Sequence, residues 1–279
     1  MEFERIAPAL IGPPTVGDGD GGGPGDPVVI SSFGRSGTHL TIDLIRRQFP
    51  AFASWKWPGE CMSALYCRLD AAVAGSAPPA AELRALRRAP RPIIKTHHWL
   101  EWLGAPVNPL MSWVRDRGTV IHAVRDPVAV LPSIWALNHT GAARGLGPPP
   151  PAPEFVRHEA AAWARQTCAI LDRPPPLVLP YEDILADPLG TTLRIAALLN
   201  EAPALCDPLL PAAWTSLAEA RWARIISIRP RSTAILASRR IARLKPFRWT
   251  PELRALLADG CGAEMRALGY DAREPGLSL

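Results

Sequence analysis

Short apolar runs alternate with stretches of helical spacing along this chain. Four short runs are apolar apart from His122 in the third, which is typical of strands buried on both faces of a sheet. They are Val28–Ile30, Ile93–Ile94, Val120–Val124 and Leu177–Leu179. A helical pattern follows the first run, with apolar residues at Leu40, Leu44, Ile45 and Phe49. This repeated strand-then-helix order predicts an α/β fold, with a central parallel sheet flanked by helices.

Three helix starts can be read from the local sequence. Asp126-Pro127, Asp187-Pro188 and Thr250-Pro251 each place a capping side chain before a proline at the first helical position. Pro132 lies inside the first of these helices, where it should remove a hydrogen bond and bend the axis. Gly269 is the expected stop of the last helix.

Some segments have loop-like composition. Residues 1–26 end in "VGDGDGGGPGD", which can bury little apolar area and predicts a disordered lead-in. The segment "GLGPPPPAP", residues 145–153, predicts a loop. We therefore expect one domain over residues 27–279, in which about 50–90 and 140–160 carry no motif.

Charge favours an anionic partner. The net charge is +5 and the isoelectric point about 9.2. Nine basic residues and no acid lie between Arg221 and Arg248. A nucleic acid could be that partner, but no nucleic-acid-binding motif accompanies the segment, and a phosphate-bearing small molecule explains it equally well.

Three further patterns narrow the class of protein. Five cysteines without tight ligand spacing indicate a reduced protein and no metal site. No run of about 18 uncharged apolar residues is present, so no membrane span is expected. Charges near the N-terminus argue against a secretory signal, which favours the cytoplasm.

The stretch "SSFGRSGTH" has the form of an anion-binding loop. It leads from a strand to a helix N-terminus, where free N–H groups and the helix dipole favour an anion. Gly34 and Gly37 permit a close turn, and Arg35 adds a permanent charge. Short donor side chains follow at Ser36, Thr38 and His39. A strand–turn–helix that binds nothing fits the glycine spacing about as well.

The loop lacks the parts that hold a nucleoside triphosphate. The Lys that would reach the terminal phosphates and the hydroxyl that would hold Mg²⁺ are missing after Gly37. Arg125 at a strand end and Ser133 eight residues later could hold a second phosphate. A helix-start salt bridge and a surface serine are the alternative interpretation of that pair.

Four motifs of this chain resemble those of a known family. "SSFGRSGTH" resembles the 5′-phosphosulfate loop of sulfotransferases, and "VIHAVRDPVAVLPSIW" is similar to their 3′-phosphate motif. "KTHH" and "PYEDILADPLGTTLRIAALL" resemble two further motifs, and all four occur in the family's order across about residues 27–200. The tail "LRALLADGCGAEMRALGYD" is similar to the closing helix of many bacterial members. The resemblance implies a P-loop-like sulfotransferase fold.

The resemblance also implies a reaction. The donor would be 3′-phosphoadenosine-5′-phosphosulfate (PAPS), the product adenosine 3′,5′-bisphosphate (PAP), and no metal would be needed. A sulfonate group would move to a hydroxyl or amine of an acceptor. The family's catalytic positions correspond to His97 as general base, Arg35 and Lys95. Its donor-binding positions correspond to Arg35, Ser36, Gly37, Thr38, His39, Arg125, Ser133 and Tyr181.

Several assignments stay open on the sequence. His98 or a carboxylate could be the base instead of His97, and Leu40 stands where many members stack a Trp on adenine. The best stand-ins for the family's late phosphate-binding segment are Arg239 and Arg240, with Arg229 and Arg231 as competitors.

The acceptor has no motif of its own. In the family, the regions about 50–90 and 140–160 face the acceptor. Tryptophans lie there or nearby at Trp55, Trp57, Trp99 and Trp102. They would suit an aromatic, polycyclic or glycan small molecule, although ordinary packing explains them equally. The alternatives to a sulfotransferase are a degenerate P-loop kinase and a non-catalytic basic nucleic-acid-binding protein. No nucleic-acid or membrane partner is expected, and the oligomeric state is not predicted.

Overall fold

The computed structural model describes residues 25–53, 65–70, 85–87, 89–97, 109–142, 151–210 and 247–271. Within these residues the strands form one sheet in the order β2-β3-β1-β4-β5. Every neighbouring pair is parallel. The strands are β1 (Val28–Ser32), β2 (Cys67–Arg68), β3 (Ile93–Thr96), β4 (Thr119–Val124) and β5 (Leu177–Pro180). The predicted α/β class with a parallel sheet is confirmed.

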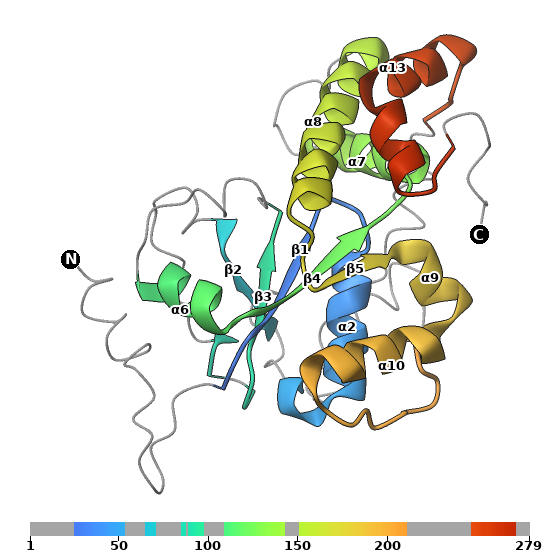
Figure 1. The fold of residues 1–279 in the computed structure, drawn as a ribbon. Helices are drawn as coiled ribbons and strands as arrows, with labels where there is room; N and C mark the ends of the chain where they lie inside the picture. The colour runs from blue at the N-terminus through green and yellow to red at the C-terminus, as the bar shows by residue number, and fades with distance from the viewer. Residues whose placement is uncertain are drawn as a thin grey trace, which may run out of the picture.

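Helices cover both faces of the sheet (Figure 1). The described helices are α2 (Thr38–Gln48), the 3₁₀ turn η1 (Pro50–Phe52), α6 (Pro109–Arg117), α7 (Pro127–Ala142), α8 (Ala152–Asp172), α9 (Tyr181–Ala186), α10 (Pro188–Leu199) and α13 (Pro251–Ala267). In Figure 1, α7, α8 and α13 gather at the end toward which β4 points.

Alternate residues of β1 enter different cores. Val28 and Ile30 pack in a cluster that includes side chains of α2, α9 and α10. Val29 packs in a second cluster with side chains of α6 and the end of α8. Because successive strand side chains point to opposite faces, a strand with both faces covered must be apolar throughout. That is the physical reason for the apolar runs in the sequence.

A third core joins α7, α8 and α13. Trp163 of α8 is buried there. Aromatic rings continue it: the ring centroids of Trp135 and Phe247 lie 5.4 Å apart, and those of Phe247 and Trp249 lie 5.0 Å apart. Trp249 Nε1 also donates to the carbonyl oxygen of Val128 at 3.1 Å. These contacts pack the C-terminal segment against the helix that follows β4.

The predicted helix caps are present. Asp126 Oδ1 accepts from the N–H of Val128 at 2.8 Å, and Asp187 Oδ1 from Gly190 at 2.8 Å. Thr250 caps α13, which ends at Ala267, two residues before Gly269 with its φ of 81°. Helix α7 contains Pro132, as expected.

Three details differ from the sequence prediction. Helix α8 begins at Ala152, inside the loop expected over 145–153, because a proline is tolerated in a first helical turn and the N–H of Phe155 donates to Pro151 at 3.0 Å. Strand β2 and helix α6 were not predicted. With two residues, β2 is too short to carry a periodic signal.

Some predicted features lie outside the described residues. They are most of the lead-in, His98, the tryptophans at 55, 57, 99 and 102, and the arginines at 229, 231, 239 and 240. Across the described part of the chain, no helix combines the length and apolarity that a membrane crossing requires.

Candidate functional site

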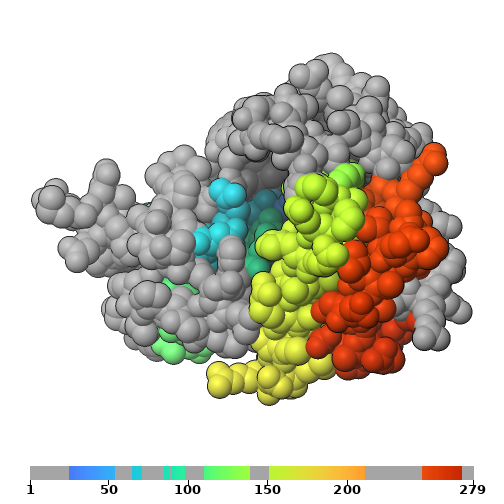
Figure 2. Space-filling view, turned by 90° about the horizontal axis from the view of Figure 1, so that it is seen from above, coloured from blue at the N-terminus to red at the C-terminus, as the bar shows by residue number. Residues whose placement is uncertain are grey.

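The carboxyl ends of the parallel strands converge at one edge of the sheet. The central strand β1 has β3 on one side and β4 on the other, so the chain changes direction across the sheet at β1. In open α/β sheets, ligands bind beside such a switch point. Seen from above the view of Figure 1, the surface is hollowed between residues 65–70 and 85–97, in cyan and teal, and α8, in yellow-green (Figure 2).

The loop after β1 has an unusual backbone. Gly37 has a φ of 94°, and an added Cβ there would lie 2.5 Å from Cδ2 of Tyr181. Arg35 has a φ of 69°, a strained value for a residue other than glycine, and strain of this kind clusters at functional sites. Helix α2 begins directly after Gly37 with no side chain capping it among the described residues. A helix start of this kind favours an anion through its N–H groups and its dipole.

Two polar atoms at this edge support an anion site. Ser36 Oγ and Arg125 Nε are buried and have no hydrogen-bond partner within the described part of the structure. Buried polar atoms are nearly always hydrogen-bonded in folded proteins. Because both can donate, a phosphate oxygen is a suitable partner for each.

Two arginines lie close together at the site. Arg35 Nε donates to Ser133 Oγ at 2.9 Å. The Arg125 guanidinium lies 4.1 Å from the ring centroid of Tyr181. Burial, and then the positive charge of Arg125, lower the pKa of Arg35 from its ordinary value. The repulsion between the arginines would be relieved by a bound anion.

Ser133 contacts Arg35 in this structure. The sequence prediction that Arg125 and Ser133 hold one phosphate together stays a prediction. All three side chains still belong to one cluster, which Tyr181 completes.

His97 is held in a defined tautomer. Its Nδ1 lies 2.9 Å from the carbonyl oxygen of Ser32 and 3.2 Å from Ser32 Oγ. A carbonyl oxygen only accepts, so Nδ1 carries the proton and the lone pair of the neutral ring is on Nε2. The N–H of His97 donates to Asp70 Oδ1 at 3.3 Å. Ser32 Oγ also lies 2.5 Å from Thr38 Oγ1, which connects the histidine to the start of α2.

Lys95 lies in a small polar cluster beside this histidine. Its Nζ is 3.4 Å from His39 Nε2 and 5.5 Å from the ring centroid of Tyr66. The hydroxyl of Tyr66 is 3.1 Å from the same nitrogen of His39. An ammonium only donates, so Nε2 of His39 is an acceptor toward Lys95.

Two titratable groups lie just below the site. Burial, and then the charge of His97, lower the pKa of His122 to about 3, so this ring is neutral at ordinary pH. Its Nδ1 is 3.2 Å from Ser31 Oγ. Burial also raises the pKa of Asp126 to about 6; its hydrogen bond from Val128 opposes the shift, and Glu182 adds to it.

The structure thus brings most of the predicted site residues to one edge. Contacts connect Arg35, Arg125, Ser133, Tyr181 and Gly37 in one group. Thr38 and His97 both contact Ser32, and Lys95 contacts His39. Sequence reasoning missed the supporting residues Ser32, Tyr66, Asp70, Glu182 and Tyr270. Ser32, Glu182 and Tyr270 stand inside the quoted motifs, whereas Tyr66 and Asp70 have no local signal. In the described residues, no group of three or more His, Cys, Asp or Glu is placed to hold a metal ion.

Known proteins were compared with the chain. No protein-family model and no curated protein matches it. Among solved structures it is similar to retinol dehydratase in complex with retinol and PAP, with 17% identity and a TM-score of 0.44, over 98% of this chain and 88% of that one. It is also similar to the sulfotransferase domain of the Synechococcus PCC 7002 olefin synthase, with 15% identity and a TM-score of 0.43, over 89% and 96%.

A sulfotransferase domain from the curacin biosynthetic pathway gives a similar result. The identity is 17% and the TM-score 0.42, over 89% of this chain and 98% of that one. At such low identities and TM-scores, no residue role passes from these proteins to this chain.

Proposed function

We propose that this chain is a sulfotransferase that uses PAPS to modify a hydroxyl or amine of an acceptor. The observation that carries the proposal is a convergence at one sheet edge. A helix start with a buried serine that has no partner among the described residues, together with two arginines, lies beside a histidine whose basic nitrogen is Nε2. An anion site next to a base is what group transfer from a phosphosulfate requires.

The donor would be held at two anion sites. Ser36, Gly37, Thr38 and His39 at the start of α2, together with Arg35, would bind the 5′-phosphate. Arg125 and Ser133 would bind the 3′-phosphate. Tyr181 would contact the adenine, with its ring already packed between Gly37 and Arg125. Arg239 and Arg240, outside the described residues, remain proposed contacts of the 3′-phosphate.

The reaction requires a base and positive charge from this chain. The donor supplies an activated sulfonate on a phosphate leaving group. His97 Nε2 would take the proton of the acceptor, while Nδ1 keeps its hydrogen bond to Ser32 and so fixes the ring. Arg35 and Lys95 would stabilise the negative charge that develops on the sulfonate and the leaving oxygen.

The acceptor is proposed to be a small molecule, such as an aromatic, polycyclic or glycan alcohol. The regions about 50–90 and 140–160 would face it, as parts of a single domain over residues 27–279. We propose the cytoplasm as the site of action.

Binding of PAP to the full chain, measured by isothermal titration calorimetry, tests the donor assignment. We expect saturable binding without metal, and no binding at millimolar PAP by folded protein would contradict it. Turnover of PAPS with phenols, sterols and sugars then tests the chemistry. His97→Ala should lose about 10²–10⁴-fold in turnover while still binding PAP. Near-normal turnover in this variant, with loss in His98→Ala, would assign the base to His98.

The same protein preparation distinguishes the other classes. Mg²⁺-dependent ATP turnover would indicate the kinase alternative. Salt-sensitive binding of DNA or RNA that PAP does not displace would indicate a nucleic-acid-binding protein.

A further inference from the structure

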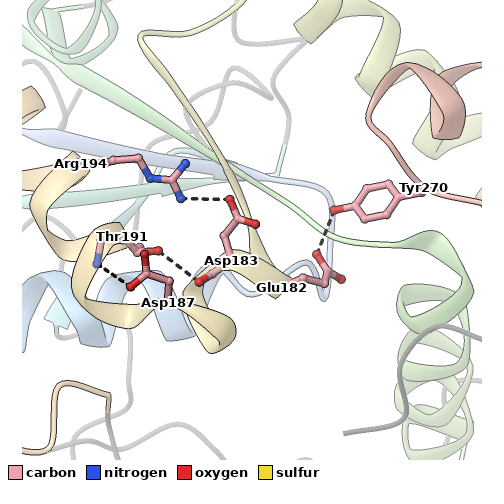
Figure 3. Close-up of polar contacts among 7 residues, drawn as sticks. Glu182, Asp183, Asp187, Thr191, Arg194 and Tyr270 are labelled. Carbon is pink, nitrogen blue, oxygen red and sulfur yellow. Dashed lines mark hydrogen bonds and ion pairs between the residues drawn. The ribbon is translucent and has the colours of Figure 1, made fainter.

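A hydrogen-bonded bridge connects the C-terminal segment to the anion site. The hydroxyl of Tyr270 donates to Glu182 Oε2 at 2.9 Å (Figure 3). The other oxygen of the same carboxylate, Oε1, accepts from the N–H of Asp126 at 3.3 Å. One carboxylate therefore joins residue 270 to the residue that follows Arg125 in the chain.

The bridge lies at the ends of β4 and β5, next to Arg125 and to the ring of Tyr181. Arg125 and Asp126 follow β4 directly, and Tyr181 and Glu182 follow β5. The stacking of Arg125 on Tyr181 depends on how these two strand ends lie relative to each other. The sheet pairs β4 with β5 as far as Val124 and Pro180, and Glu182 adds a bond between the residues that follow.

Glu182 differs from the acids near it. Figure 3 shows its carboxylate directed at Tyr270, whereas Asp183 and Asp187 face α10. Asp183 pairs with Arg194 at 3.1 Å, and both side chains are 45% exposed. Asp187 caps α10 through the N–H of Gly190. Both acids therefore contact α10, and of these three acids it is Glu182 that contacts the C-terminal segment.

Tyr270 is itself held firmly. Its N–H donates to the carbonyl oxygen of Met265 at 2.8 Å, and its ring packs against the core formed by α7, α8 and α13. Burial and the neighbouring Glu182 raise the pKa of the Tyr270 phenol, so its hydroxyl remains a donor. The ring and backbone contacts would survive removal of the hydroxyl, which makes the hydroxyl separable by mutation.

We propose that Tyr270 is a positioning residue for the 3′-phosphate side of the donor site, and that it acts through Glu182 on Arg125. This inference rests on the proposed function. It predicts that Tyr270, which lies outside the sheet edge, affects binding of the donor.

Tyr270→Phe tests the inference in the full chain. We expect PAP affinity to fall about tenfold, as for loss of a hydrogen bond to a charged group, because Arg125 is no longer fixed. Adenosine 5′-phosphate, which lacks the 3′-phosphate, should bind with an affinity changed by less than about twofold. Calorimetric titration measures both, and a purely structural role would weaken both nucleotides together.

Two further variants complete the experiment. Thr250→Ala removes the cap at the other end of α13 and should leave both affinities unchanged, although α13 is weakened. Glu182→Ala should reproduce the selective loss of PAP affinity. Adding Tyr270→Phe to Glu182→Ala should cost nothing more, because the hydroxyl acts through that carboxylate.

The outcomes distinguish the positioning role of Tyr270 from the proposed sulfotransferase function. If wild-type protein binds PAP and Tyr270→Phe binds it equally well, the inference is wrong and the proposed function stands. An equal loss for both nucleotides, or a full additional loss in the double variant, also overturns the positioning role. Failure of the folded wild-type protein to bind PAP contradicts the proposed function, and the inference with it.

Discussion

Gly34 and Gly37 stand in the same loop but differ in what surrounds them. A Cβ added to Gly34 meets no atom of the described residues within 4 Å. A Cβ on Gly37 would lie 2.5 Å from the Tyr181 ring, on a backbone with a φ of 94°. Glycine is therefore required at 37 by both conformation and packing, whereas at 34 space is available.

This contrast gives a matched pair of variants. We predict that Gly37→Ala weakens PAP binding at least about tenfold and costs about 1–3 kcal/mol of stability, because it strains the loop and displaces Tyr181. Gly34→Ala should bind PAP within about twofold of wild type. Calorimetry and thermal unfolding measure both effects. Equal behaviour of the two variants would show that Tyr181 is not packed on the loop.

His122 makes stability depend on pH. Its pKa in the folded protein is lowered to about 3 by burial, while the unfolded chain has the ordinary value of 6.5. Below pH 6.5 the unfolded chain therefore takes up a proton that the folded protein does not. The stabilising contribution is fully present above pH 6.5 and is lost as the pH falls toward 3.

We predict that His122 accounts for about 2 kcal/mol of stability lost between pH 6.5 and 5. Thermal or denaturant unfolding of His122→Gln should show a shallower pH dependence over this interval. His158→Gln is the matched control, because that histidine is exposed at 76% of its side chain. It should keep the wild-type pH dependence, and the same slope in all three proteins would refute the prediction.

At the scale of elements, the sequence predicted those features whose cause lies within a few residues. Asp126-Pro127 and Thr250-Pro251 predicted their helices correctly because a cap and its N–H lie within a few residues. Tyr66 and Ser32 had no such signal. Tyr66 reaches His39 from 27 residues away, and Ser32 reaches His97 from 65 residues away, so both contacts exist only once the sheet has formed.

Asp126, at the start of α7, makes the stability of the protein depend on pH. The pKa of Asp126 is raised to about 6 from its ordinary 3.8, chiefly by burial. For an acid shifted upward, the folded state favours the protonated form, so its contribution to stability falls as the pH rises from about 4 to about 6. Asparagine cannot ionise but still caps a helix well.

We predict that Asp126→Asn gains stability relative to wild type as the pH rises from 4 to 7, by about 1–2 kcal/mol with solvent screening included. Asp187→Asn is the control, since Asp187 caps α10 in the same way but is exposed. Unfolding curves at both pH values for the three proteins measure the effect. A relative stability of Asp126→Asn that does not change with pH would contradict it.

At the scale of the whole molecule, distant parts of the chain meet at the site. The loop after β1 comes from the first described segment, and Tyr270 from the last. The sequence predicted the strands β1, β3, β4 and β5 along the chain, but not that Tyr270, after α13, would donate to Glu182. That contact depends on the packing of α13 on α8, which no local pattern encodes.

PAP bound at this site should stabilise distant parts of the folded protein together. Since a ligand that binds only the folded state shifts unfolding by mass action, PAP at about 100 times its Kd should raise the free energy of unfolding by about 2.7 kcal/mol. Amide hydrogen exchange should slow in α13 as well as in α2, because Tyr270 is joined through Glu182 to Asp126, the neighbour of Arg125. Adenosine without phosphates should have little effect, and Arg125→Met should abolish most of the PAP effect. Slower exchange confined to α2 would show that α13 is not coupled to the site.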